Sequence, residues 1–92
     1  MEEKAKKIAE LLKILANEYR LLIVCFLMKQ PMTVSELAKE MPAVTQSALS
    51  QHLKLMKAHG ILDAVKSGQN VTYSIHDHRV KEIIHTLQKF YC

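Results

Sequence analysis

A mainly α-helical domain with one β-hairpin is the fold class that this sequence predicts. Residues 33–76 read as helix, tight turn, helix and hairpin in unbroken succession. Every Gly and Pro of the chain lies between predicted elements, at positions 31, 42, 60 and 68, so turn chemistry and hydrophobic period place the boundaries at the same points. This succession, with the hairpin as a wing, is typical of the winged helix-turn-helix class.

Two helices are expected ahead of this segment. Residues 3–16 have the spacing of an amphipathic helix, and Asn17 can cap a second helix over residues 18–29. The apolar face of the first helix consists of Ile8, Leu11, Leu12 and Leu15. The second helix contains the run LLIVCFLM, which is apolar on all sides. Its length also fits a strand, but the Asn cap and Pro31 favour a central, buried helix.

A capping box formed by Thr33 and Glu36 predicts where the next helix begins. The Thr hydroxyl can accept the Glu backbone N–H, and the Glu carboxylate can accept the Thr N–H. This helix is expected to end near Met41, because Pro42 has no N–H to donate and disfavours helical geometry in the residue before it.

The second helix of this segment can begin after Thr45 and end at Gly60. An apolar stripe at Leu49, Leu53 and Met56 predicts the side that faces the core. The opposite side is polar and consists of Gln46, Ser47, Ser50, Gln51, Lys54 and Lys57. A buried stripe beneath a polar face is the pattern of a helix that reads the DNA major groove.

A hairpin and a last helix complete the domain. Residues 61–66 and 71–76 have strand character, with SGQN as the turn between them. Asp77 can cap the last helix. The apolar side of this helix consists of Val80, Ile83, Ile84, Leu87 and Tyr91, and its polar side of His78, Lys81, Glu82, His85 and Lys89.

Length and composition predict one domain over residues 1–92 that forms a homodimer. At this length a monomer buries only about 60–65% of its unfolded surface, which is marginal without a partner. Pairing of the first and last helices across a two-fold axis would cover their apolar stripes, and a two-fold dimer suits a palindromic operator. The net charge of +4 is compatible with double-stranded DNA as a partner but decides little alone.

The chain is expected to be cytoplasmic, without a membrane segment. The apolar run over residues 21–28 is too short to span a bilayer, and the N-terminal MEEKAKK does not have the layout of a signal peptide. In a reducing compartment, Cys25 and Cys92 are expected to be thiols. No nucleophile–base–acid set and no phosphate-binding Gly loop is present in the sequence, so neither enzymatic activity nor a cofactor is expected.

The sequence resembles the ArsR/SmtB family of bacterial repressors over essentially the whole chain. Four segments carry the resemblance: ILANEYRLLIVCFL, SELAKEM, TQSALSQHLKLMKAHGIL and GQNVTYSI. In that family the string SQS-x-x-S-x-H opens the recognition helix, and here Thr45 stands in place of the first Ser. The resemblance implies a homodimer that represses transcription and releases DNA when an inducer binds. The positions carried over as DNA-binding residues are Thr45, Gln46, Ser47, Ser50, Gln51 and His52.

Both metal sites of that family lack ligands in this sequence. The thiolate site would need Cys residues at the positions of Thr33 and Ser35. The zinc site of the last helix would need His residues at the positions of Arg79 and Phe90, although its Asp77 is retained. No metal is therefore expected at either site.

The placement of Cys25 and Cys92 is similar to the two-cysteine subgroup typified by the BigR, SqrR and HlyU repressors. This resemblance implies that a persulfide or another oxidant links the two sulfurs and that the linkage releases the operator. The two residues are expected within about 10 Å of each other, a bound that allows for inserted sulfur atoms. Judged without the family, Cys25 also fits a small core residue, because free Cys is among the most often buried residue types.

The polar residues of the recognition helix and hairpin divide into expected roles. Gln46 and Gln51 can pair with adenine in bidentate fashion and are the better base readers. The expected phosphate contacts are Lys54, Lys57 and Lys66. Gln69 in the hairpin turn completes the expected DNA-binding set. His52 fits two interpretations, a hydrogen bond to a phosphate or packing beneath the helix.

Two functions stay open beside the thiol-switched repressor. One is a metal-responsive repressor that uses the histidines of the last helix together with Cys92, and a zinc titration distinguishes it. His78, Glu82 and His85 share one face of that helix and could ligate a metal; the alternative is that this face is only solvated. The other is a winged helix used for protein contacts, which DNA binding at moderate salt would exclude.

Overall fold

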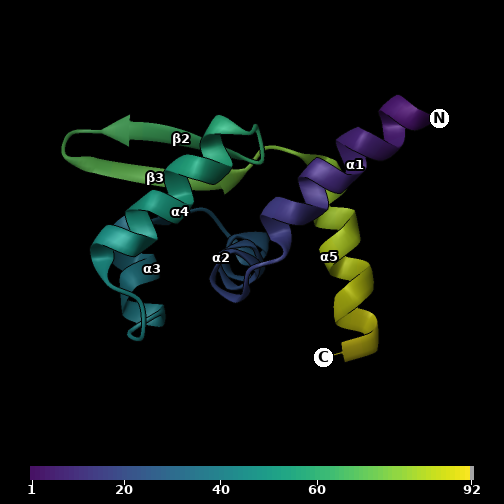
Figure 1. Cartoon of the computed structure of the whole chain (residues 1–92). Helices are drawn as coiled ribbons and strands as arrows, with labels where there is room; N and C mark the ends of the chain where they lie inside the picture. Colours follow the sequence, from purple (N-terminus) through teal and green to yellow (C-terminus); the bar gives the residue numbers. More distant parts are fainter. Residues whose placement is uncertain (92) are drawn as a thin grey trace.

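The computed structural model describes residues 1–91, apart from the side chain of Tyr91, and contains five helices and three strands in this range (Figure 1). The helices are α1 (Glu2–Leu15), α2 (Glu18–Lys29), α3 (Val34–Glu40), α4 (Gln46–Ala58) and α5 (His78–Tyr91). The strands are β1 (Met32–Thr33), β2 (Leu62–Ser67) and β3 (Asn70–Ile75). The predicted winged helix-turn-helix is confirmed: α3 and α4 are the two helices of the motif, and β2 and β3 form the wing.

Four helix caps predicted from single polar residues are present. The Asn17 side chain accepts the backbone N–H groups of Tyr19 and Arg20 at 3.0 and 3.1 Å. Thr33 and Glu36 form the reciprocal capping box, with bonds of 3.1 and 2.8 Å. The remaining two caps are bonds of 3.1 Å from the Ala48 N–H to the Thr45 hydroxyl and of 2.9 Å from the Arg79 N–H to the Asp77 carboxylate. These bonds satisfy N–H groups that a helix cannot pair internally.

The wing strands β2 and β3 belong to a three-stranded antiparallel sheet of order β1-β3-β2, in which β3 is the middle strand. Both hairpin strands lie one residue from the predicted bounds, since Ser67 pairs with Asn70 across a two-residue turn. Gly68 has a φ of +62° there, at the position where a type II′ turn requires a positive value. The short strand β1 was not predicted, because two residues are too few to show an alternating pattern; Thr33 both pairs with Thr72 of β3 and caps α3.

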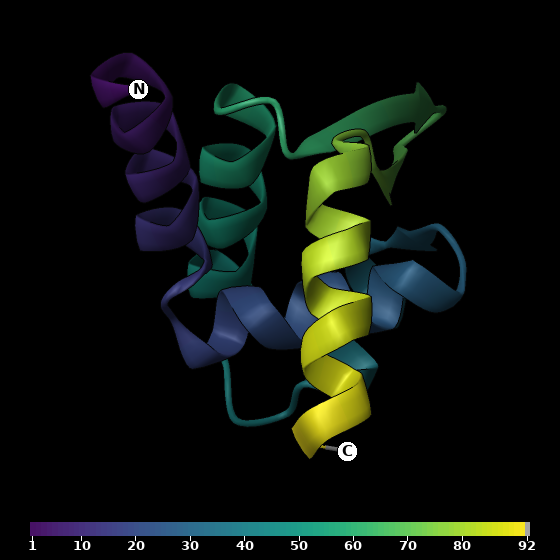
Figure 2. The same cartoon turned by 90° about the vertical axis from the view of Figure 1, so that its right-hand side faces the viewer.

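The core is built around α2, which is seen end-on in the middle of Figure 1 and contacts α1, α4, α5 and β3. Ile23 and Val24 of α2 are completely buried, which confirms the expectation of a central helix. In Figure 2, which faces the right-hand side of Figure 1, α1 and α5 lie toward the viewer, α4 lies behind them and α2 crosses below. The wing and α3 extend away from this side. Within residues 1–91, no helix is long and apolar enough to cross a bilayer.

Candidate nucleic-acid interface

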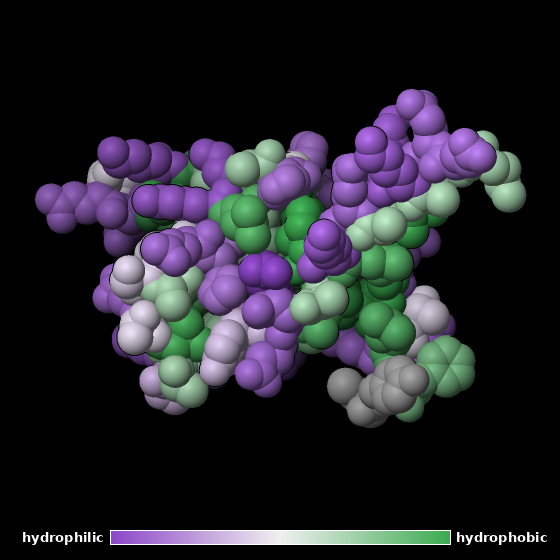
Figure 3. Space-filling view, viewed as in Figure 1, coloured by the Kyte–Doolittle hydropathy of each residue, from purple (hydrophilic) through white to green (hydrophobic). Residues whose placement is uncertain are grey.

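Helix α4 has one buried and one exposed side, as its sequence predicted. Leu49, Leu53 and Met56 are completely buried in the core. The residues on the other side are exposed or, for Ser50, half-buried; they are Gln46, Ser47, Ser50, Gln51, Lys54 and Lys57. Figure 3 shows that polar residues predominate on the surface over α4 and the hairpin. This helix can therefore present amide, hydroxyl and ammonium groups to a ligand without losing its packing.

The start of α4, the start of α3 and the wing tip surround a hollow of about 240 Å³. Gln46 and Ser50 of α4 line it together with Ser35, and Gln69 and Asn70 reach it from the wing. The fold thus brings Gln69 next to residues 19 or more positions earlier, as a combined surface of helix and wing requires. Thr45 lies beside this surface and is exposed, while its hydroxyl accepts the Ala48 N–H.

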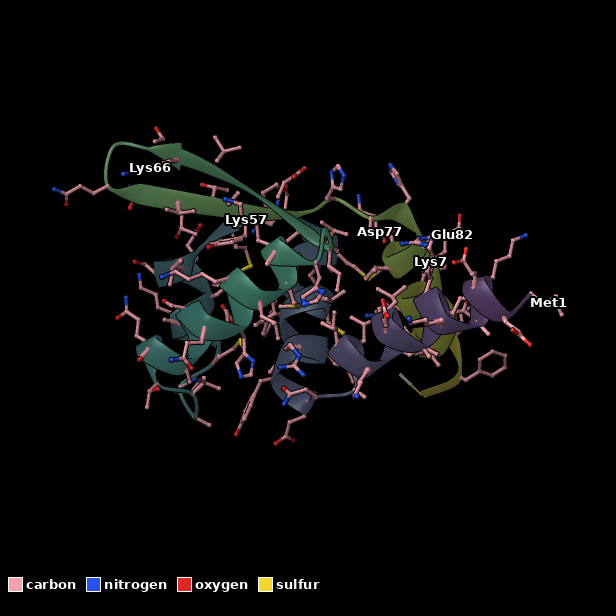
Figure 4. The ribbon with its side chains drawn as sticks, turned by 45° about the horizontal axis from the view of Figure 1, so that its top comes forward. Met1, Lys7, Lys57, Lys66, Asp77 and Glu82 are labelled. Carbon is pink, nitrogen blue, oxygen red and sulfur yellow. The ribbon has the colours of Figure 1, made fainter. Side chains whose placement is uncertain are left out.

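Basic groups flank this polar surface. Lys54 and Lys57 of α4 and Lys66 of β2 are exposed. Figure 4 shows Lys66 near the wing tip and Lys57 on α4 toward the middle of the molecule, while Met1, Lys7 and Glu82 lie toward the opposite end. An ammonium group is a compact point charge, so these residues suit phosphate contacts better than base recognition.

His52 lies beneath α4 rather than on its polar side. The imidazole is half-buried, its ring centre is 6.1 Å from that of Tyr19, and its Nδ1 is 3.4 Å from Arg20 Nη1. Burial and, second, the positive charge of Arg20 lower the pKa of His52 from its usual value of 6.5. Of the two interpretations left open by the sequence, the geometry matches packing beneath the helix.

Sequence reasoning missed Arg20 as a residue connected to this surface. Its Nε donates to the carbonyl oxygen of Ile14 in the last turn of α1, so one guanidinium touches α1 and approaches α4. The available signal was an arginine directly before the apolar run LLIVCFLM, where a charged group near the core needs specific partners.

A second candidate surface is apolar and lies on α1 and α5. Ile8 and Leu12 of α1 are 53% and 46% exposed, and Leu87 and Phe90 of α5 are 44% and 77% exposed. Figure 3 shows hydrophobic residues gathered on the right-hand side over these two helices. Other residues of the two predicted stripes pack into the core of the domain: Leu15, Val80 and Ile84 are buried.

Cys25 lies on α2 and is half-buried rather than fully enclosed in the core. Together with Tyr19, Leu21 and Leu22 it lines an apolar surface hollow of about 370 Å³. Cys92 lies outside the described residues, directly after the end of α5. The expected separation of Cys25 and Cys92 therefore remains a prediction.

The positions that resemble metal sites are engaged in other contacts. The Asp77 carboxylate, the retained zinc-site residue, is paired with Arg79 through bonds of 2.6 to 3.2 Å. This pairing is the main cause of the lowered pKa of Asp77. Thr33 is used in the capping box. In the described part of the chain, His78, Glu82 and His85 do not form a cluster of three groups able to hold a metal ion.

Comparisons with known proteins point to one group of regulators. The family described as "Bacterial regulatory protein, arsR family" matches residues 17–64. The transcriptional activator HlyU of Vibrio cholerae is 39% identical over 100% of this chain and 84% of its own length. The HTH-type transcriptional regulator YgaV of Escherichia coli is 36% identical over 100% of this chain and 93% of its own length.

Solved structures give the same picture. HlyU from V. cholerae N16961 superimposes with a TM-score of 0.93 at 39% identity, covering 100% of this chain and 99% of that one. A structure described as reduced HlyU also has a TM-score of 0.93, covering 100% and 96% of the two chains. The transcriptional repressor BigR from Xylella fastidiosa has a TM-score of 0.91 at 28% identity and covers 100% and 93%.

Proposed function

Because the chain belongs to the arsR family of bacterial regulatory proteins and is a transcriptional regulator, we propose that it is a homodimeric repressor that binds a palindromic operator and releases it when Cys25 and Cys92 are joined. Its relatives are named both as an activator, HlyU, and as a repressor, BigR. A protein that only occupies an operator blocks transcription without a further activating surface, so repression is the simpler of the two functions.

The observation that carries the DNA-binding half of the proposal is the shared hollow between α4 and the wing. Gln46 and Ser50 of α4 line it together with Gln69 of the wing, so one surface can follow both a groove and the adjoining backbone. Gln46 and Gln51 supply paired donors and acceptors for base edges. Lys54 and Lys66 supply charges for phosphates.

The exposed apolar residues of α1 and α5 support the homodimer. Four large exposed apolar side chains on α1 and α5 are costly to leave in water, at about 25 cal/mol for each Å². A two-fold axis beside these helices covers both copies with one self-complementary contact. It also presents two α4 helices to successive turns of one face of the DNA.

The position of Cys25 supports the thiol switch. It is accessible from the surface through an apolar hollow and lies on the helix that packs against both α4 and α5. Forming a disulfide removes two electrons and two protons from the thiols. An organic hydrodisulfide can accept these electrons and protons and is thereby reduced to a thiol and hydrogen sulfide. Sulfur atoms that stay between the two cysteines would give a longer bridge.

DNA binding is tested by selecting duplexes from a random pool and measuring the Kd of the selected duplex by fluorescence anisotropy. Gln51→Ala should weaken binding of this duplex by about thirtyfold to 10⁴-fold, the range for losing one bidentate base contact in each of the two protomers, while sedimentation still reports a dimer. A matched control is Gln30→Ala, at an exposed position directly after α2, which should bind like wild type. Equal Kd values for wild type and Gln51→Ala would contradict the assigned reading surface.

The switch is tested by treating the protein with an inorganic polysulfide and recording its intact mass and its Kd. The expected product has lost two hydrogen atoms per protomer, with or without added sulfur, and no longer binds the selected duplex. Cys25→Ser and Cys92→Ser should bind like wild type before treatment and stay bound after it. Release of DNA by treated Cys25→Ser protein would show that the switch lies elsewhere.

A further inference from the structure

Three helices meet at the guanidinium of Arg20. Its Nε donates to the carbonyl oxygen of Ile14, one of the carbonyls at the end of α1 that the helix leaves unpaired. Its Nη1 lies 3.4 Å from Nδ1 of His52 on α4. Its own backbone N–H is held by the Asn17 side chain at 3.1 Å. A side chain fixed at its base on α2 therefore bridges the apolar-faced helix α1 and the DNA-reading helix α4.

The contact defines the protonation state of His52. A guanidinium can only donate hydrogen bonds, so the 3.4 Å contact is a hydrogen bond only when Nδ1 accepts, which is the neutral imidazole with its proton on Nε2. The groups that face the imidazole from α2 are the Arg20 guanidinium and the Tyr19 ring, 6.1 Å away and tilted by 44°. A protonated ring would place two donors of like charge against each other in this half-buried position.

We propose that Arg20 and His52 are positioning residues for operator binding: their contact sets the orientation of α4 relative to α1 and α2, and it opens when the imidazole takes up a proton. The proposal rests on the proposed DNA-binding function. It assigns His52 a role beneath the recognition helix instead of a contact with DNA.

The sign of the pH dependence separates these two roles. Burial and the charge of Arg20 lower the pKa of His52 in the folded protein, so the contact is complete above its unfolded value of 6.5 and is lost as the pH falls. Operator binding should therefore weaken on acidification. A histidine that contacts a phosphate behaves in the opposite way, because protonation adds an attractive charge.

The test compares the Kd of the selected duplex at about pH 8 and about pH 5.5 at constant ionic strength. His52→Gln removes the titration but keeps an acceptor, Oε1, for the Arg20 N–H. Relative to His52→Gln, wild type should lose about three- to tenfold in affinity between the two pH values, the effect of one partly exposed hydrogen bond. His59→Gln, at an exposed position at the end of the same helix, is the matched control and should retain the wild-type pH profile.

A second readout follows the imidazole directly. In an NMR titration of the free protein, the ring of His52 should titrate below 6.5, and in Arg20→Met it should titrate at a higher pH than in wild type. An unchanged His52 titration in Arg20→Met would show that the guanidinium does not act on the imidazole and would overturn the proposal; the same spectra report whether the domain stays folded.

Each outcome is decisive. Tighter binding of wild type at low pH that His52→Gln abolishes would assign His52 to a phosphate contact and overturn the proposal. Identical pH profiles for wild type and His52→Gln would also overturn the proposal, because His52 would then have no pH-dependent role in binding. Absence of any selected duplex at about pH 8 would instead refute the proposed DNA-binding function, since the contact is intact at that pH.

Discussion

Replacing Lys66 by Ala should flatten the salt dependence of operator binding. Lys66 is exposed on the wing, and in residues 1–91 it takes part in neither of the two ion pairs, His76 with Asp63 and Arg79 with Asp77. Its ammonium is therefore available to a phosphate. Each phosphate that a protein neutralises contributes about 0.9 to the slope of log Kd against log salt concentration.

The magnitude follows from the three exposed lysines, Lys54, Lys57 and Lys66, on the α4 and wing side. A dimer carries them twice, so six phosphate contacts predict a slope of about 5 and a loss of about 10³-fold in affinity between 50 and 200 mM salt. Lys66→Ala removes one contact from each wing. The slope should fall to about 3.6, and the loss over the same range to about 10²-fold.

The assay is fluorescence anisotropy of the selected duplex over a series of KCl concentrations. Lys4→Ala on α1, at an exposed position, is the matched charge control and should keep the wild-type slope. Gln69→Ala on the same wing should weaken binding without changing the slope, because a neutral amide releases no counterion. A Lys66→Ala slope equal to that of wild type, or an equal change in Lys4→Ala, would refute this use of the wing.

Three further predictions concern stability. Leu53→Ala should lower the free energy of unfolding by about 2–5 kcal/mol in urea titrations, because Leu53 is completely buried under α4; a loss below about 1 kcal/mol would contradict the packing. Gly68→Ala should cost about 1–2 kcal/mol through backbone strain alone, since φ is +62° and a Cβ would meet nothing within 4 Å; an unchanged urea midpoint would mean a different turn. Asp77→Ala should cost about 1 kcal/mol as a lost cap. Because the pKa of Asp77 is lowered in the folded protein, the stabilisation by its carboxylate is present above pH 3.8 and is lost as the pH falls below this value. If Asp77→Ala stayed less stable than wild type at lower pH, the ionised carboxylate would not be the cap.

Most of the fold was predictable because its boundaries depend on local chemistry. Asn17, Thr33, Thr45 and Asp77 each precede an apolar period, and each forms the expected cap bond. The strand β1 was not predictable, because its two residues are ordered by pairing with β3, some 40 positions later in the chain. Pairing over such a distance leaves no local pattern in the sequence.

The site was predictable where it follows helical period and not where it depends on packing between helices. The period of α4 separated the buried Leu53 from the exposed Gln51 correctly. The same period could not decide the direction of His52, which lies at the border between the two sides. Its partner Arg20 is 32 positions away, and a single polar pair between two helices produces no repeating signal.

The connection between the thiol switch and DNA binding can be tested at Arg20. Cys25 lies five residues after Arg20 on α2, about 7.5 Å along the helix axis, and Ile23 and Val24 anchor the segment between them in the core. A bond at Cys25 that moves α2 therefore moves Arg20 with it, and α4 receives the movement through His52. In Arg20→Met, polysulfide treatment should still join the cysteines by mass, but the resulting change in Kd should be smaller by about two- to thirtyfold. An undiminished change in Kd would mean that the signal reaches α4 through other contacts of α2.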